Sequence, residues 1–285
     1  MTFRRWIPNL HIHPILMVFI GISFLTGTFL ELSVILAIVL VHELGHYIAA
    51  RSFKWRIRRI MLWVFGGVMD TDEHGNRPIW QEVIVTVAGP IQHLFIYLII
   101  FFVAQTEWLS PYILETILYY NTAILIFNLL PIWPLDGGKL LLLFLSMKFP
   151  YKKAYNNTIL FSLIGSGLFV CFQFFPFTLS SFLIMIFLFM ENRKEWKHRH
   201  YVFMRFLLNR YEGITQVKKV QPIYVSGKDK LMDVFSLFKR DKKHSIYIQY
   251  NENSRLSVDE TECLRSYFYD KQLNTPVGEV FHGSS

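Results

Sequence analysis

The stretch VLVHELGH, residues 39–46, decides how this chain is interpreted. On an α-helix, His42 and His46 stand four residues apart, so both imidazoles project from one face and can share a metal ion. Glu43 lies about 100° around the helix from His42, close enough to act on a metal-bound water without being a ligand. The preceding residues, 33–41, are apolar apart from the first. Three ionisable side chains at the end of such a run are costly in lipid and indicate a functional site.

The alternative is a chance pattern, in which each histidine is an isolated core residue bonded to a backbone carbonyl. We favour the metal site, because the HExxH pattern sets three residues at the spacing of a zinc hydrolase.

The composition is typical of a membrane protein with several spans. Of the 285 residues 53% are hydrophobic and 27 are Phe, more apolar than an ordinary soluble chain. The net charge is +8, but the basic residues cluster between apolar runs, so we assign them to membrane topology and expect no nucleic-acid partner. Cys171 and Cys263 form neither a disulfide framework nor a zinc spacing. The first apolar run begins at Pro14, lacks a signal-peptide cleavage site, and is expected to remain as a membrane helix.

Apolar stretches near the ~20 residues that cross a bilayer occur six times, which predicts a polytopic α-helical membrane protein of about six transmembrane helices. The predicted spans are 14–32, 33–53, 83–104, 111–130 with a broken continuation, 158–174 and 177–190. The first two are separated only by residues 31–33, so their boundary is uncertain. Membrane lipid is therefore an expected partner.

Basic residues lie on alternate sides of these spans. The loops around Glu31, at 105–110 and at 173–176 contain no Lys or Arg. The basic residues that flank the other span ends are Arg4, Arg5, Arg51, Lys54, Arg56, Arg58, Arg59, Lys148, Lys152, Lys153, Arg193, Lys194, Lys197 and Arg199. By the positive-inside rule, both termini and the loop at 51–81 are cytoplasmic.

From about His198 the composition changes, so we divide the chain into a membrane domain, 1–196, and a linker helix with a small cytosolic α/β domain, 197–285. Residues 196–210 form a basic, aromatic helix that lies at the membrane surface or serves as an ordinary linker. In the small domain we expect strands at 222–226, 245–250 and 255–258, with a helix through Leu231 and Phe238 between the first two. Asp259 is expected to cap a helix that ends at Phe268.

A catalytic zinc ion usually takes three protein ligands, so the two histidines need a partner. Ionisable candidates near apolar runs are Glu31, His93, Glu107, Glu115 and Asp136. Asp136 stands in NLLPIWPLDGGK, residues 128–139, where prolines and glycines must interrupt a helix. Irregular backbone at membrane depth is tolerated only when buried or lining a watery cavity. Asp136 can therefore reach a metal, although a simple N-cap is the alternative.

HELGH together with the N-x-x-P-x-x-P-L-D-G pattern of 128–137 resembles the site-2 protease family of intramembrane zinc metalloproteases. The likeness extends to FGG at 65–67, EHGNRP at 73–78, AGP at 88–90 and the C-terminal soluble domain. It implies one Zn²⁺ per chain, with Glu43 as the catalytic acid/base. The implied zinc ligands are His42, His46 and Asp136.

Within that family the likeness is to members that act in endospore formation. It implies regulated intramembrane proteolysis of the sigma-factor precursor pro-sigma-K, inhibitory membrane partners, and a place in the mother-cell membrane around the forespore. Phe65, Gly66, Gly67, Asn128 and Pro134 would bind substrate. The adjacent glycines would also allow an extended peptide to approach a strand edge.

For three polar residues the sequence leaves two roles open. Asn128 either bonds an unwound substrate or holds two helices together. His93 is favoured as a helix-packing residue over one that hydrogen-bonds a zinc ligand. Lys139 is favoured as a residue that extends to the headgroups over one that acts on substrate.

The small domain resembles a single CBS domain, which implies ATP binding near Ser257 and Glu260 in a homo-oligomer. A docking domain without a small ligand is the alternative. For the whole chain, a metal-ion transporter and a non-catalytic membrane scaffold also stay open. Neither needs a general base at Glu43, so substituting Glu43 separates them from the enzyme.

Overall fold

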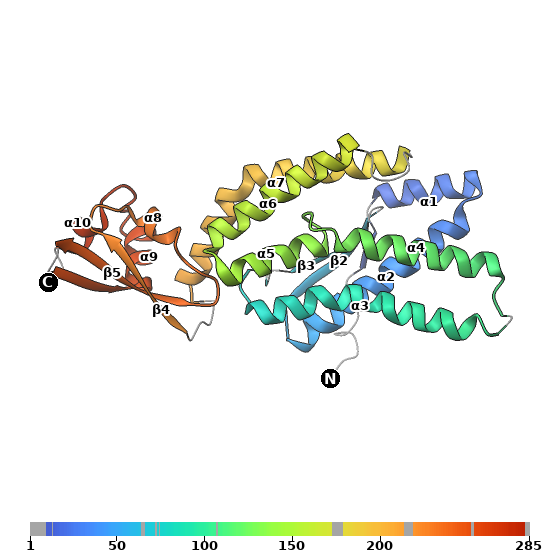
Figure 1. Cartoon of the computed structure of the whole chain (residues 1–285), viewed down its shortest axis with the longest axis horizontal. Helices are drawn as coiled ribbons and strands as arrows, with labels where there is room; N and C mark the ends of the chain where they lie inside the picture. Colours follow the sequence, from blue (N-terminus) through green and yellow to red (C-terminus); the bar gives the residue numbers. More distant parts are fainter. Residues whose placement is uncertain are drawn as a thin grey trace. The chain divides into compact units, whose positions relative to one another are not determined.

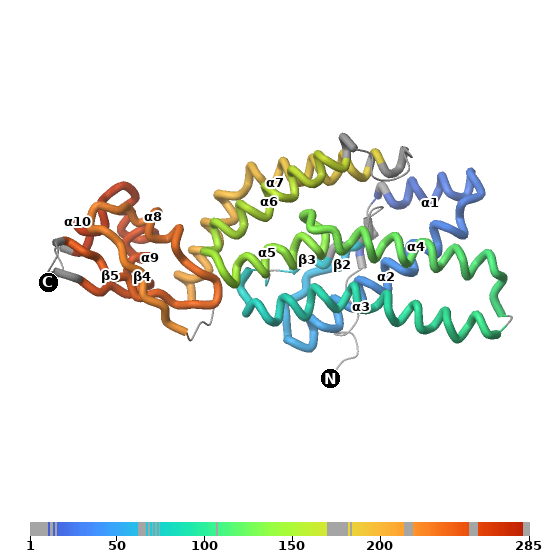
Figure 2. Tube along the Cα trace, in the orientation of Figure 1, coloured from blue at the N-terminus to red at the C-terminus, as the bar shows by residue number. Residues whose placement is uncertain are grey.

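The computed structural model describes residues 10–12, 14–63, 66–71, 73, 75–106, 108–172, 179–213, 219–251 and 254–282, and Figure 2 traces the chain through them. The chain forms two compact units. The first comprises Met1–His74, Trp80–Leu140 and Thr178–Ile184, and the second comprises Gly75–Ile79, Leu141–Phe177 and Met185–Ser285.

The first unit consists mainly of helices (Figure 1). Among the residues that the structure describes, three helices are long and apolar enough to cross a membrane, namely α2 (Phe29–Ser52), α3 (Ile79–Val103) and α4 (Pro111–Leu129). At 1.5 Å per residue, the 25 residues of α3 extend about 37 Å, more than the ~30 Å hydrocarbon core of a bilayer. Large apolar side chains face outward along α3, among them Phe95, 53% exposed, and Ile99, 60% exposed. Such a surface suits lipid.

The six-span prediction is confirmed for these three helices, and the other spans remain predictions. The first helix, α1 (Pro14–Thr26), contains only a short apolar run. It ends at Thr26, directly before Gly27, where φ is +74°, so the boundary with α2 lies before the expected 31–33. Glycine adopts this left-handed conformation without steric cost. The two remaining expected spans fall on α6 (Tyr151–Phe172) and α7 (Leu179–Tyr211).

A three-stranded sheet, which the sequence did not predict, combines one strand that precedes α1 with two strands that follow α2. It is made of β1 (Leu10–Ile12), β2 (Ile57–Trp63) and β3 (Gly66–Thr71), in the order β1-β2-β3. β1 pairs in parallel with β2, and β2 pairs antiparallel with β3. β3 is thus an edge strand, and it packs against α2. Phe65 lies outside the described residues.

A buried apolar cluster joins the end of α2, the start of the sheet and α3. Its centre is Trp55, 1% exposed, with Ala50 and Val85. Burial of large apolar side chains is the main stabilising term for such a junction. The cluster therefore fixes the HExxH helix against α3 one turn beyond His46.

The break predicted between 128 and 139 is confirmed. α4 ends at Leu129, and α5 (Asp136–Lys148) begins at Asp136. A Cβ at Gly137 would lie 2.2 Å from the carbonyl oxygen of Leu129, and one at Gly138 would lie 2.5 Å from the backbone of Trp133. Only glycine allows the connecting segment to fold back this closely over the start of α5.

The second unit contains the end of α5 from Leu141, the long helix α6, α7 from Met185 onward and the C-terminal α/β domain. The domain consists of β4 (Val220–Ser226), α8 (Leu231–Phe235), β5 (Lys243–Asn251), β6 (Ser254–Asp259), α9 (Glu260–Phe268) and α10 (Val277–His282). β4 pairs in parallel with β5, which pairs antiparallel with β6. The predicted order of strands and helices is confirmed, as is the cap, because the Asp259 carboxylate accepts from the Thr261 N–H at 3.3 Å. α10 was not predicted.

The C-terminal domain also contacts the short segment Gly75–Ile79 within the same unit. The Asp241 carboxylate accepts a hydrogen bond from the Ile79 N–H at 3.1 Å, and Arg240 donates to the Arg77 carbonyl at 3.0 Å. Asn209 of α7 lies 2.6 Å from the Asn76 side chain. Asp241 thereby satisfies one of the unpaired N–H groups at the start of α3.

Candidate metal centre

The first unit brings three side-chain donor atoms to one buried point. The Nε2 atoms of His42 and His46 lie 3.0 Å apart, and each lies 3.1 Å from Oδ2 of Asp136. All three residues are buried, and the two histidines come from α2 whereas Asp136 begins α5. The structure thus gathers the three predicted ligands from positions about ninety residues apart along the chain.

The spacing of these atoms suits a zinc ion. Two ligand atoms, each ~2.0–2.1 Å from tetrahedral zinc, lie about 3.3 Å from one another. The observed separations of 3.0–3.1 Å are close to that value. Two imidazole nitrogens and one carboxylate oxygen also leave a fourth position for water or substrate, as catalytic zinc sites do. Among the described residues, His42, His46 and Asp136 are the group that could hold a metal ion.

The second nitrogen of each imidazole has its own partner. His46 Nδ1 lies 2.7 Å from the carbonyl oxygen of Val85 on α3. Because a carbonyl only accepts, Nδ1 of His46 carries the proton and Nε2 keeps its lone pair for a metal. His42 Nδ1 lies 3.0 Å from Nε2 of His93, also on α3. His93 was expected to serve helix packing, but the structure favours the other interpretation, a direct bond to the predicted zinc ligand.

Glu43 is buried on the same helix, with its side chain against β3. A Cβ added at Gly67 would lie 2.2 Å from Cγ of Glu43, so the side chain rests directly on the glycine backbone. Gly66 precedes it on the strand. Gly67, one of the predicted substrate-binding residues, therefore lies against Glu43, the predicted catalytic acid/base.

Gly89 provides a similar close approach on α3. An added Cβ there would lie 2.3 Å from Nε2 of His46 and 2.8 Å from Cε1 of His42. The AGP motif of 88–90 therefore has glycine at its centre because any larger residue would clash with the two imidazoles.

Lys139 differs from its expected position. Its ammonium lies 3.1 Å from Oδ1 of Asp136, one turn along α5, instead of extending only towards headgroups. The two carboxylate oxygens of Asp136 therefore have different partners. Oδ1 faces Lys139 and Oδ2 faces the histidines, which orients a single oxygen towards a metal.

Asn128 and Pro134 are half-buried near the break. The amide of Asn128 donates to the carbonyl of Ile124 on its own helix at 3.1 Å. This contact tests neither of the two interpretations of Asn128.

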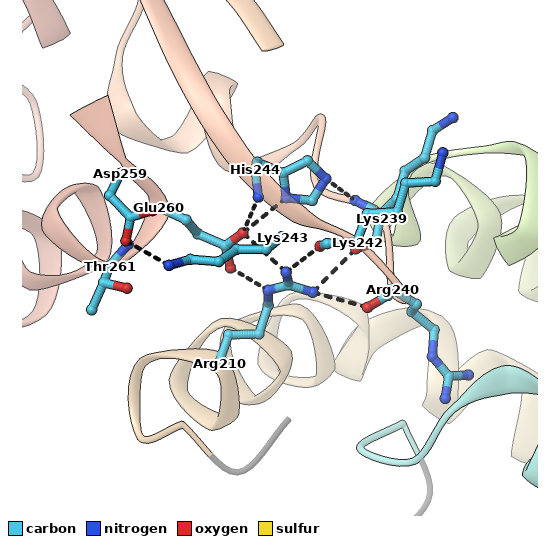
Figure 3. A network of polar contacts seen from close by, with 9 residues as sticks. All are labelled: Arg210, Lys239, Arg240, Lys242, Lys243, His244, Asp259, Glu260 and Thr261. Carbon is cyan, nitrogen blue, oxygen red and sulfur yellow. Dashed lines mark hydrogen bonds and ion pairs between the residues drawn. The ribbon is translucent and has the colours of Figure 1, made fainter. Parts of the chain in front are cut away.

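Ser257 and Glu260, the proposed nucleotide residues, lie in different surroundings. Ser257 is exposed on β6. Glu260 is buried, and its carboxylate accepts from Nε and Nη2 of Arg210 and from the backbone N–H and Nδ1 of His244 (Figure 3). Burial alone would raise the pKa of the Glu260 carboxyl, but the bonds from His244 and Arg210 outweigh it and hold that pKa below its ordinary value. The structure therefore brings Glu260 to Arg210 and His244.

Sequence reasoning missed Asn121 of α4, which is fully buried against His93. Its Oδ1 lies 2.8 Å from Nδ1 of His93, and its amide nitrogen lies 3.3 Å from the His93 carbonyl oxygen. The sequence could have indicated this residue, because burying an asparagine side chain in an apolar span costs free energy unless the side chain has a hydrogen-bond partner. The sequence could not have indicated the Val85 carbonyl, because every residue has a backbone carbonyl and this one meets His46 only through the position of α3.

A centre of this kind, inside apolar helices, belongs to a metallohydrolase that works within the membrane. The profile of Peptidase family M50 matches residues 30–112 and 104–171. Stage IV sporulation protein FB of Bacillus subtilis is 39% identical over 283 residues, which cover 97% of this chain and 98% of that protein. Zinc metalloprotease MJ0392 of Methanocaldococcus jannaschii is 32% identical over 67% of this chain and 57% of that protein.

A solved structure agrees with these matches. The site-2 protease from Methanocaldococcus jannaschii superposes with a TM-score of 0.54 at 25% identity, covering 66% of this chain and 90% of that one. The chain therefore belongs to Peptidase family M50 and is an integral membrane zinc metalloprotease of the site-2 protease type. Membership in this family removes the transporter and scaffold alternatives.

Proposed function

We propose that this protease cleaves a membrane-associated precursor, pro-sigma-K, in regulated intramembrane proteolysis during sporulation. The observation that carries the chemistry is the buried convergence of His42, His46 and Asp136 beside Glu43. The likeness to stage IV sporulation protein FB along almost the whole chain supports the choice of substrate.

In this proposal His42, His46 and Asp136 hold one Zn²⁺. When bound, zinc polarises the scissile carbonyl and lowers the pKa of water to about 7. Glu43 accepts a proton from the attacking water and delivers it to the leaving amine. Its position supports this role, because Glu43 shares a helix with the two histidines but points at Gly67. Lys139 holds the second oxygen of Asp136 away from the histidines.

The edge of β3 is the proposed binding place for the substrate. A peptide bond in an intact helix is hidden by backbone hydrogen bonds, so the substrate must be locally extended when it is cut. An extended segment can add to the edge of a sheet through main-chain hydrogen bonds. β3 is such an edge, and Gly67 on it touches Glu43. Phe65 and Pro134 would line the path, and Asn128 would bond the extended strand.

The proposed topology has six spans with both termini in the cytoplasm, in the mother-cell membrane around the forespore. The Lys and Arg distribution supports the orientation. The same proposal includes inhibitory membrane partners that act during sporulation, and assembly of the protease as a homo-oligomer.

The C-terminal domain is proposed to be CBS-like and to dock the substrate or bind ATP. Its strand order supports the first part. A nucleotide site there now depends on Ser257, because the Glu260 carboxylate is occupied by Arg210 and His244. Calorimetry with ATP on the full-length chain tests this part separately.

The decisive experiment is co-expression with pro-sigma-K. Intact protease should convert the precursor, and Glu43→Gln should lower the rate by at least ~10²–10⁴-fold with zinc content unchanged. Glu31→Gln, on the same helix but away from the centre, serves as the matched control and should cleave normally. Cleavage by a verified Glu43→Gln preparation at the rate of the control would contradict the mechanism, and a stable precursor beside active protease would contradict the substrate.

A further inference from the structure

A buried chain of hydrogen bonds runs from His42 on α2, through His93 on α3, to Asn121 on α4. Nδ1 of His42 lies 3.0 Å from Nε2 of His93, and Nδ1 of His93 lies 2.8 Å from Oδ1 of Asn121. His93 and Asn121 are both 0% exposed, and His42 is 4% exposed. The three residues come from three different helices, so the chain exists only in the folded membrane domain.

The directions of these bonds follow from the chemistry of the groups. A ligand that offers Nε2 to a metal carries its proton on Nδ1, so His42 donates to His93. His93 must then accept at Nε2 and carry its own proton on Nδ1, which donates to the carbonyl oxygen of Asn121. The Asn121 amide nitrogen, 3.3 Å from the His93 carbonyl, donates there and sets which way the amide faces. One asparagine orientation thus determines the tautomer of two imidazoles.

The two predicted ligands on α2 are oriented in different ways. His46 bonds the backbone carbonyl of Val85, which cannot change its role. His42 instead bonds a second imidazole, which could equally present a donor. A donor at that position would require His42 to accept at Nδ1 and to carry its proton on Nε2, the nitrogen that faces Asp136. His42 therefore depends on His93 being held in one tautomer.

We propose that His93 and Asn121 are positioning residues, which hold His42 in the metal-binding tautomer and ring orientation. The proposal rests on the metal centre of the proposed function and adds to it the α3–α4 pair that makes one ligand competent. Partners that fix a ligating histidine typically change metal affinity 10- to 100-fold. The competing explanation is that Asn121 only joins two membrane helices.

The same two helices offer a matched control for that explanation. Tyr97 of α3 and Thr122 of α4 are joined by a hydroxyl–hydroxyl hydrogen bond of 2.7 Å. Thr122 is the sequence neighbour of Asn121, but this bond does not lead to His42. Thr122→Val therefore removes an α3–α4 bond without touching the chain to the metal centre.

The experiment measures zinc binding by the purified full-length chain, by competition with a chelator, and records the ligand-field spectrum of the cobalt-substituted protein. Asn121→Leu and His93→Phe should weaken zinc binding about 10- to 100-fold and alter the cobalt spectrum. Thr122→Val should leave both unchanged. Asn121→Asp retains the acceptor towards His93 and should bind zinc more tightly than Asn121→Leu.

Two results would overturn the proposal in distinguishable ways. If His42→Ala loses zinc but Asn121→Leu and His93→Phe bind it like the intact chain, the metal centre stands and the positioning role is wrong. If the intact chain takes up no zinc, the metal centre itself fails, and the positioning role with it. Should Asn121→Leu not fold, His93→Gln against His93→Phe decides, because only Gln offers His42 an acceptor.

Discussion

Replacing Arg210 by Met should strongly favour local unfolding of the C-terminal domain, because this side chain is the centre of a buried network of hydrogen bonds. Arg210, at the end of α7, has a side chain only 3% exposed. Its guanidinium donates to both oxygens of Glu260 and to the carbonyls of Lys239, Arg240 and Lys242 (Figure 3). A guanidinium has five N–H donors, and five bonds are formed.

The expected loss follows from what is left behind. Arg210→Met leaves the Glu260 carboxylate buried with only the two bonds from His244. Removing one partner of a buried ion pair costs about 3–5 kcal/mol in free energy of unfolding. A loss of about 4 kcal/mol is a factor of about a thousand in the opening equilibrium.

Hydrogen exchange of the full-length chain measures this opening. The amides of β5 are buried in the centre of the sheet, and their exchange should accelerate about a thousandfold in Arg210→Met. The control is Lys243→Met, which removes the ion pair with Asp259, both side chains being 42% exposed. An exposed pair contributes at most ~1 kcal/mol, so the control should change exchange by less than about tenfold.

A combined Arg210→Met and Glu260→Leu variant should recover part of the loss, because no lone buried charge remains. If Arg210→Met accelerates exchange no more than the Lys243→Met control, the reasoning from buried charge is refuted. Equal exchange in the single and the combined variant would show that the three backbone carbonyls, and not Glu260, account for the loss.

Three further predictions concern the two units separately. Asp136→Asn should weaken zinc binding at least ~10-fold in chelator competition, and unchanged affinity would assign the third ligand elsewhere. Gly67→Ala should reduce cleavage with zinc content unchanged, because the added Cβ would lie 2.2 Å from Cγ of Glu43, whereas Gly21→Ala, with no atom within 4 Å, should cleave normally. The C-terminal domain should lose stability as pH falls below about 6.5, because burial, against the opposing bond to Glu260, holds the pKa of His244 below its ordinary value. Protonation then favours the unfolded domain, and the depressed pKa of Glu260 acts in the same direction at lower pH. Exchange of β5 amides between about pH 7.5 and about pH 5.5, corrected for the intrinsic rate, should show the loss, and constant protection would contradict it.

The sequence predicted the local features of the centre correctly, because each one is encoded by neighbouring residues. Helical spacing puts His42 and His46 on one face whatever surrounds them. Prolines and glycines between 128 and 139 had to break the helix, so a start of α5 at Asp136 could be expected. In the C-terminal domain, β-branched and aromatic residues predicted the strands, and Asp259 predicted the start of α9.

Only the tertiary structure decided which distant groups meet. A helical period tells which residues share a face, but not which other helix that face contacts. His93 was therefore expected to serve packing, and Asn121 was not singled out, although the fold joins both to His42. Glu260 looked available for a ligand until α7 brought Arg210 beside it.

The sheet shows the same limit. Its strands pair across gaps in sequence, β1 with β2 about fifty residues later, and hydrogen bonds between backbones carry no residue-specific signal. The sequence by itself thus determined the residue types of the candidate metal centre and the order of elements from β4 to α9. The fold determined the partners of those residues, because a buried polar group must find its hydrogen bonds wherever the packed helices and strands place them.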